Sequence, residues 1–357
     1  MKTSFANTSR FGKESPFEPE TFSINASRRS FAGFVVTGIS ILMMGQRLAL
    51  AQPDGKIYRV GALSNWGTGP FIDTLKSELA KLGYVEGKNV VFEARFPEGK
   101  LERLPGFAAE LAALGVDVIA TYGGPPTEAA RKATNRIPIV AAILADPVGV
   151  GFAASLERPG GNITGITSDD PELGKRQYEI LKQVVPNLKR VAILSDSDIP
   201  GADASGLAPI ERANVAAALT ADITAQVLKV RGPTPDFNSA FKAMAEQKAE
   251  ALVVLQVPAL FSTRKRIAEL AMSHRLPTIF WGDASDAGGL FCYGTSFTDT
   301  FVGVPKVVDR ILKGAKPSDL PFEQITRRYF AVNLKTARAL GLSIPADLVK
   351  RADSIVE

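Results

Sequence analysis

Small polar side chains, glycines and aspartates follow several short apolar runs of this sequence, where they could bind a ligand. Hydroxyl, amide and helix N–H groups suit a carboxylate, and Asp146 or Asp283 could hold an ammonium. Thr68 and Gly69 would add N–H groups at a helix N-terminus, which suits a small anion. Each aspartate could instead cap a helix or form a turn, and the Thr68 loop could be an ordinary turn. The predicted ligand-binding residues are Ser64, Asn65, Thr68, Tyr122, Gly123, Gly124, Ala145, Asp146, Asp196, Gln256 and Asp283.

The residue patterns of common enzymes are missing from this sequence. His274 is the only histidine, and no second histidine or cysteine lies near it at metal-ligand spacing, which argues against a zinc site. A Ser-His-Asp triad would need His274, but no serine stands in a G-x-S-x-G elbow. The phosphate-binding loop G-x-x-x-x-G-K-[ST] is absent, and Ile72 replaces the third glycine of a dinucleotide loop. We therefore expect no catalytic residue, no metal and no cofactor.

The elements that would position these residues alternate between strands and helices. Strands separated by amphipathic helices predict βαβ units, and hence parallel sheets with helices on both faces. The segments 117–142 and 250–281 share one order of strand, proline-bearing loop, helix and strand, which favours two lobes built on one plan. The chain would cross between the lobes near residue 166 and again near 293–299. Strands are predicted at 58–63, 89–94, 116–124, 137–147, 190–194, 223–230, 251–255 and 277–281, and helices at 70–83, 101–115, 171–185, 208–219, 237–248, 262–273 and 300–314.

In parallel sheets of this kind, ligands bind beyond the carboxyl ends of the strands. Most of the predicted ligand-binding residues stand at such ends, so they should converge from the two lobes. Trp66, Tyr122 and Trp281 could supply stacking faces there, or could belong to the edge of the core.

The N-terminal residues 1–51 have the layout of a secretory signal. Arg28 and Arg29 precede an uncharged apolar run at 31–44, and Ala49-Leu50-Ala51 offers small residues for cleavage near Ala51. The arginine pair resembles the twin-arginine export motif, and general secretion is the open alternative. A transmembrane anchor is disfavoured because the run is shorter than a membrane span and contains polar residues. We expect a periplasmic protein with no stable membrane anchor after cleavage.

Charge and cysteine content narrow the class further. Without residues 1–51, basic and acidic side chains nearly balance, so no nucleic-acid partner is expected. Cys292 is the only cysteine, so an intramolecular disulfide is excluded. We expect Cys292 to be buried as an apolar residue. A monomer is expected, and residues 52–357 are enough for two domains.

Five long segments resemble one known family. They are "LGYVEGKNVVFEARFPEGKLERLPGFAAEL" (82–111), "ADPVGVGFAASLERPGGNITGI" (145–166), "GGLFCYGTSFTD" (288–299), "VDRILKGAKPSDLPFEQ" (308–324) and "VNLKTARALGLSIPADLVKRADSIVE" (332–357). They are similar to periplasmic substrate-binding proteins of ABC transporters, in the tryptophan/tyrosine-type branch.

The resemblance implies a type I periplasmic-binding-protein fold, with two Rossmann-like lobes, a three-stranded hinge and a ligand in the cleft. It places the ligand loops at Ser64 to Thr68, Tyr122 to Gly124, Ala145-Asp146, Asp196, Gln256 and Asp283. The chain departs from the family at Pro126, at 195–209 and at 255–262, which leaves the ligand's identity open.

The predicted function is a solute-binding component that closes over a small polar ligand and delivers it to a membrane permease. An amino acid, aromatic or other, is the substrate class that the resemblance implies. An exported ligand sensor and a Rossmann-like α/β enzyme are the alternatives. The predicted division is a signal peptide at 1–51, lobe 1 at 56–165 plus 296–320, and lobe 2 at 166–295 plus 321–357.

Overall fold

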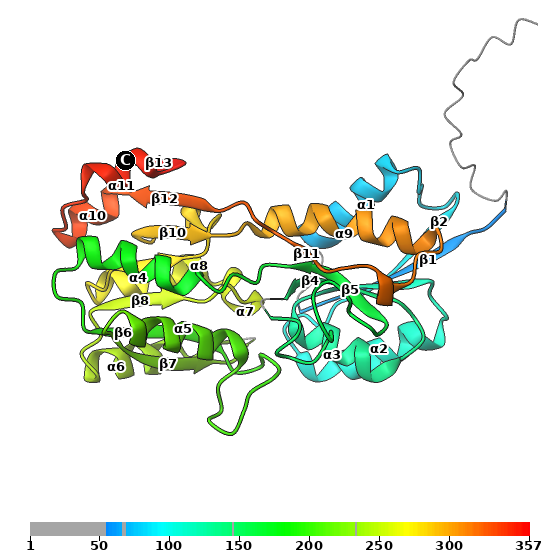
Figure 1. The fold of residues 1–357 in the computed structure, drawn as a ribbon, viewed down its shortest axis with the longest axis horizontal. Helices are drawn as coiled ribbons and strands as arrows, with labels where there is room; N and C mark the ends of the chain where they lie inside the picture. Colours follow the sequence, from blue (N-terminus) through cyan, green and yellow to red (C-terminus); the bar gives the residue numbers. More distant parts are fainter. Residues whose placement is uncertain (1–54, 66–68, 145, 233) are drawn as a thin grey trace, which may run out of the picture. The chain divides into compact units, whose positions relative to one another are not determined.

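Alternating strands and helices build two separate sheets in this protein (Figure 1). The structure, a computed structural model, describes residues 55–65, 69–144, 146–232 and 234–357. We call each sheet with its helices a lobe. Both sheets are parallel except for one pair of strands, so the predicted α/β class with two parallel sheets is confirmed.

The first lobe has a six-stranded sheet in the order β11-β5-β4-β3-β1-β2. Side chains alternate between its faces: Val60 and Ala62 pack in one core cluster, and Leu63 packs in the other. The strands are β1 (Tyr58–Ser64), β2 (Val90–Arg95), β3 (Val118–Tyr122), β4 (Ile139–Leu144), β5 (Ile163–Thr167) and β11 (Glu323–Gln324). The helices are α1 (Pro70–Lys81), η1 (Leu101–Arg103), α2 (Leu104–Ala113), α3 (Gly124–Ala133), α9 (Phe297–Leu312) and η3 (Pro317–Asp319).

The second lobe has a seven-stranded sheet in the order β13-β12-β10-β9-β8-β6-β7, in which β12 runs antiparallel to β10. Its central strands are buried runs such as "ALVV" in β8. The strands are β6 (Arg190–Asp196), β7 (Thr224–Val230), β8 (Ala251–Val254), β9 (Thr278–Phe280), β10 (Phe291–Gly294), β12 (Tyr329–Asn333) and β13 (Ser354–Val356). The helices are α4 (Leu173–Val184), α5 (Pro209–Thr220), α6 (Phe237–Glu246), α7 (Pro258–Phe261), α8 (Arg264–Ser273), η2 (Ser285–Ala287), α10 (Leu334–Leu340) and α11 (Ala346–Arg351).

The chain crosses between the lobes three times within its described part. It leaves the first sheet after β5, returns after β10 into α9, which packs against α1, and leaves again between β11 and β12 (Figure 1). The first two crossings lie where the sequence predicts them. The residue boundaries predicted for the two lobes stay a prediction; in the sheets themselves, β5 and β11 both pair within the first lobe.

The histidine and the cysteine of the sequence have the surroundings predicted for them, at the end of a helix and in the core. His274 is exposed and ends α8, with its ring 5.4 Å from that of Phe241. Cys292 is buried in β10, and burial raises the pKa of its thiol above the usual range. Across the described ranges, no helix combines the length and the apolar character that a membrane span requires. The predicted signal peptide lies outside these ranges.

Candidate functional site

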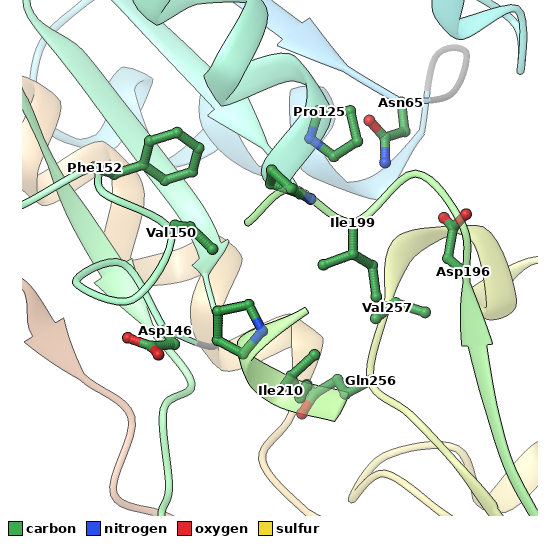
Figure 2. A pocket seen from close by; sticks show the side chains of 13 residues that line it. Asn65, Pro125, Asp146, Val150, Phe152, Asp196, Ile199, Ile210, Gln256 and Val257 are labelled. Atoms are coloured by element: carbon green, nitrogen blue, oxygen red, sulfur yellow. The ribbon is translucent and has the colours of Figure 1, made fainter. Parts of the chain in front are cut away.

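A cavity that is partly open to solvent lies between residues of the two lobes (Figure 2). Both groups of residues stand at or beyond the carboxyl ends of parallel strands, where α/β sheets bind ligands. From the first lobe the cavity is lined by Asn65, Gly124, Pro125, Asp146, Val150 and Phe152, and from the second by Asp196, Ile199, Pro200, Pro209, Ile210, Gln256 and Val257.

The structure brings five of the predicted ligand-binding residues together around this cavity. They are Asn65, Gly124, Asp146, Asp196 and Gln256. Each follows a different strand of its sheet, so the convergence comes from the parallel topology and not from closeness in sequence. Two other predicted residues, Thr68 and Ala145, lie outside the described residues.

The remaining predicted residues do not line the cavity. Ser64 and Gly123 are neighbours of lining residues, and Ser64 is buried in β1. Tyr122 packs inside the first lobe, with its ring 5.6 Å from Phe71 and 5.1 Å from Phe301. Burial, with the nearby charge of Asp283, raises the pKa of Tyr122 well above its usual range. Tyr122 and the buried Trp281 therefore belong to the core edge, and Trp66 lies outside the described residues.

Asp283 does not line the cavity. Its side chain lies beside the N-terminus of α9. Its Oδ2 accepts hydrogen bonds from Ser296 Oγ at 2.7 Å and, more weakly, from the Thr298 N–H at 3.4 Å. Ser296 Oγ in turn accepts from the Asp299 N–H at 3.3 Å and caps α9. These bonds are the helix-cap arrangement that the sequence leaves open for an aspartate.

We expect Ser296→Ala to lower the free energy of unfolding by about 1 kcal/mol, the usual cost of losing a helix cap. Denaturant unfolding of the variant measures this. Ligand affinity should stay unchanged, because neither Ser296 nor Asp283 lines the cavity. A variant of normal stability that loses affinity would instead support the predicted role of Asp283 in ligand binding.

Two amide side chains in the lining of this cavity have buried hydrogen-bonding atoms that no described residue satisfies. Asn65 is 2% exposed, and its Oδ1 has no hydrogen-bond partner. Gln256 is 7% exposed; its Oε1 accepts from Thr295 Oγ1 at 2.8 Å, and its Nε2 has no partner. An unsatisfied buried amide costs free energy, so a polar ligand that bonds to it would gain affinity.

Asp196 supplies a carboxylate to the wall of the second lobe. Its Oδ1 accepts from the Asp198 N–H at 3.0 Å. Burial is the main cause that raises the pKa of Asp196 to about 6, although the Asp198 hydrogen bond and the charge of Arg231 act in the opposite direction. The side chain is therefore ionised above about pH 6, where it adds negative charge to the cavity.

One wall of the cavity is a loop at 197–208 between β6 and α5, which we call the β6–α5 loop. Its tip contacts the first lobe: a Cβ added to Gly124 would come within 2.7 Å of Pro200 Cδ, and one added to Gly201 within 3.0 Å of a methyl of Val150. Only a residue without a side chain fits at position 124 beneath the proline ring.

The base of this loop is fixed to the second lobe. Buried Glu211 accepts hydrogen bonds from Ser195 Oγ and from the Ala208 N–H, each at 2.7 Å, and pairs with Lys229 Nζ at 2.7 Å. Lys229 also donates to the Gly206 carbonyl at 2.6 Å. These contacts fix the base of the β6–α5 loop to the second lobe, and the tip of the loop lies in the cleft.

Sequence reasoning missed the apolar part of the wall. These side chains come from three irregular loops and the first residues of α5, and alternating strand and helix patterns do not mark such residues. They are Val150, Phe152, Ile199, Pro200, Pro209, Ile210 and Val257. The available signals were the departures of 195–209 and 255–262 from the family pattern, which marked two of the loops but not their contacts.

A second compartment adjoins the first and shares Asp146, Pro209, Ile210 and Gln256 with it. The first hinge crossing lines it with Ser168, Asp169, Asp170 and Pro171. No group of acidic, histidine or cysteine side chains in the described ranges is arranged to hold a metal ion. With both compartments considered, the arrangement can hold an organic molecule that has polar ends and an apolar body.

Comparison with known proteins identifies the family of this chain. Residues 68–356 match the family of ABC transporter substrate binding proteins. A tyrosine-binding protein from Clostridioides difficile (strain R20291) is 23% identical over 289 residues, which cover 79% of this chain and 81% of that protein.

Solved structures agree in fold. The ABC domain in complex with L-Trp from Streptococcus pneumoniae is 25% identical, with a TM-score of 0.73, and the match covers 84% of this chain and all of that chain. A conserved domain protein from Vibrio cholerae is 24% identical, with a TM-score of 0.75 and the same coverage. The chain therefore belongs to the ABC transporter substrate binding proteins, a family of binding proteins and not of enzymes.

Proposed function

We propose that this protein binds a small polar ligand between its lobes and delivers it to the permease of an ABC uptake transporter. The favoured ligand class is an amino acid, and an aromatic one first, because the two relatives described above bind tyrosine and L-Trp. The predicted residues Asn65, Gly124, Asp146, Asp196 and Gln256 form the polar part of the proposed site.

The observation that carries this proposal is the convergence of both lobes on one cavity. Residues from β1, β3 and β4 of the first lobe face residues from β6 and β8 of the second across it. Hinge closure of two lobes over a ligand is a known route by which a binding protein signals occupancy to a partner. Three chain crossings between the lobes give such a hinge its connections.

Export completes the proposal. We place the mature protein in the periplasm as a monomer, after cleavage near Ala51. Purification from the periplasmic fraction and determination of the mature N-terminus test this part. A mature protein that retains residues 1–51 would contradict it.

Thermal unfolding of residues 52–357 against amino acids, sugars, purines and carboxylic acids tests the binding function. A ligand at one hundred times its dissociation constant adds about 2.7 kcal/mol of stability, which raises the melting temperature measurably. We expect stabilisation by aromatic amino acids and none by sugars. The protein should first be unfolded and refolded to remove any molecule that copurifies with it. Stabilisation by sugars or purines alone would contradict the proposed ligand class.

A further inference from the structure

The second compartment of the cleft is acidic and lies beside the first hinge crossing. Asp146, Asp169 and Asp170 line it, together with Gln256, which it shares with the first cavity. Of the described residues that line either compartment, none is a lysine, an arginine or a histidine. The electrostatic potential of this part of the cleft therefore favours a cationic group.

The carboxylates of the three aspartates differ in their ion-pair and hydrogen-bond partners. Asp170 pairs with Arg328 at 2.7 Å, and Asp146 Oδ1 accepts from the Gly149 N–H at 2.6 Å. The carboxylate of Asp169 has no ion pair and no hydrogen bond with any described residue. Asp169 is therefore the acid in this compartment whose charge is open to a ligand.

The backbone of Asp169 is nevertheless held in place. Its N–H donates to Thr167 Oγ1 at 3.0 Å, and its carbonyl accepts from Gln324 Nε2 at 2.5 Å. Gln324 belongs to β11, which precedes the third crossing, so two hinge segments fix this residue together. Such support is what a binding residue needs to keep its position.

A second observation points to a ligand at the same place. Gln256 is 7% exposed, lines both compartments and has an Nε2 donor without a partner. An ammonium cannot satisfy that donor, but a carboxylate, carbonyl or hydroxyl oxygen can. The site therefore offers an acceptor for a cation and a donor for an oxygen, beside an apolar wall.

Prolines reduce the number of free N–H groups at two helix N-termini of the first cavity. Helix α3 begins Gly124-Pro125-Pro126, and α5 begins at Pro209, and a proline has no N–H to donate. Helix α4, which has no proline in its first turn, begins at the second compartment, where Leu173 and Gly174 belong to the lining. Donors for an oxygen of the ligand are therefore expected in the second compartment, beside the aspartates.

We propose that Asp169 binds the ammonium group of the ligand, while Gln256 donates to an oxygen of the same molecule. This inference rests on the proposed function and narrows its ligand to an amine with an apolar body and a nearby acceptor oxygen. Asp146 adds negative charge beside Asp169, and Ile210 and Pro209 border the path between the two compartments.

The binding should depend on pH in a defined direction. Burial raises the pKa of Asp169 to about 6, with further contributions from the charges of Asp146 and Asp170. Arg328 faces Asp170 and not Asp169 in its ion pair. Because an ammonium binds the ionised carboxylate, affinity should be full above pH 7 and fall as the pH drops through about 6. Asp196 has a similarly raised pKa, so the Asp169→Asn variant is needed to assign this fall.

The experiment is calorimetric titration of the refolded mature protein at pH 8 with three compounds of one aromatic skeleton. They are tyrosine, tyramine, which lacks the carboxylate, and 3-(4-hydroxyphenyl)propanoate, which lacks the ammonium; the tryptophan series is run in parallel. The inference expects the compounds without an ammonium to bind roughly tenfold or more weaker than the amino acids, as expected for a lost charged hydrogen bond. Asp169→Asn should weaken the ammonium-bearing compounds by a similar factor and leave the deaminated ones unchanged.

The matched control is Glu172→Gln. This substitution removes one negative charge three residues after Asp169, on an exposed side chain that does not line the second compartment. It should keep wild-type affinity. Equal binding of the deaminated compounds by the wild type would overturn the inference but leave the proposed function standing. Failure of every compound, sugars and purines included, would overturn both. If Asp169→Asn does not fold, amine and acid are compared at pH 8 and pH 5 in the Asp196→Asn variant, where Asp196 no longer titrates. A preference for the amine at pH 8 that still falls at pH 5 supports Asp169, and a preference that no longer changes with pH overturns the assignment.

Discussion

The Gly124→Ala variant should lose roughly 10- to 100-fold in ligand affinity, because a methyl group at this position collides with the opposite lobe. The added Cβ would lie 2.7 Å from Cδ and 2.8 Å from Cγ of Pro200. Overpacking of this kind costs about 1–3 kcal/mol, and about 1.4 kcal/mol corresponds to a tenfold change in affinity. The cost falls only on the arrangement in which the lobes meet, so calorimetric affinity should fall more than stability.

Two further variants make this result specific. In Gly124→Ala/Pro200→Ala the ring atoms that collide are gone, so the second substitution should restore much of the affinity. Gly106→Ala adds the same methyl group to α2 of the same lobe, where no atom lies within 4 Å of the new Cβ, and should bind normally. Full affinity in Gly124→Ala would show that the β6–α5 loop does not need to seat against the first lobe.

The Glu211→Ala variant should be destabilised by about 3–5 kcal/mol, the range for breaking a buried ion pair by removing one partner. Glu211 is fully buried and satisfies Ser195 Oγ, the Ala208 N–H and Lys229 Nζ at once. Its loss leaves these groups without their acceptor and releases the base of the β6–α5 loop. Chemical denaturation measures the loss of stability. Ligand affinity should fall as well, because the cavity-lining residues Pro209 and Ile210 directly precede Glu211.

An exposed ion pair provides the control for this effect. Glu246 pairs with Lys242 at 3.9 Å, with side chains 63% and 79% exposed. Glu246→Ala should change stability by less than about 1 kcal/mol, as is usual for surface pairs. Similar losses of unfolding free energy in the two variants would mean that Glu211, although buried, contributes no more stability than an exposed ion pair.

Periodicity alone located most of the regular elements in this protein. Buried strands such as β8 and amphipathic helices such as α6 follow from local pattern, because each must bury one face or both. The alternation of these elements was enough to predict parallel sheets, and parallel sheets were enough to predict where their loops converge. The convergence of Asn65, Asp146 and Gln256 follows from that rule.

The rest of the candidate site depends on tertiary contacts that no local pattern carries. Ile199 and Pro200 line the cavity only because Glu211 and Lys229 hold their loop across the cleft. Asp169 was overlooked because it follows β5 directly at a hinge crossing, where the sequence shows only a polar run. Asp283 was included because its place after β9 resembles that of Asp146 after β4, although its carboxylate is used by Ser296 at the start of α9.

The packing of α9 on α1 constrains the order in which this protein can be made. Phe301 of α9 contacts both Phe71 and Tyr122, so one face of the first sheet is covered by a helix that lies more than two hundred residues after β1. A nascent chain emerging from the ribosome therefore cannot complete its N-terminal lobe until most of the other lobe has been synthesised. Contacts of such long sequence separation slow folding, because loop closure must precede them. The apolar surface around Phe71 stays exposed during that interval, and a chaperone that shields such surfaces would act at this stage of synthesis.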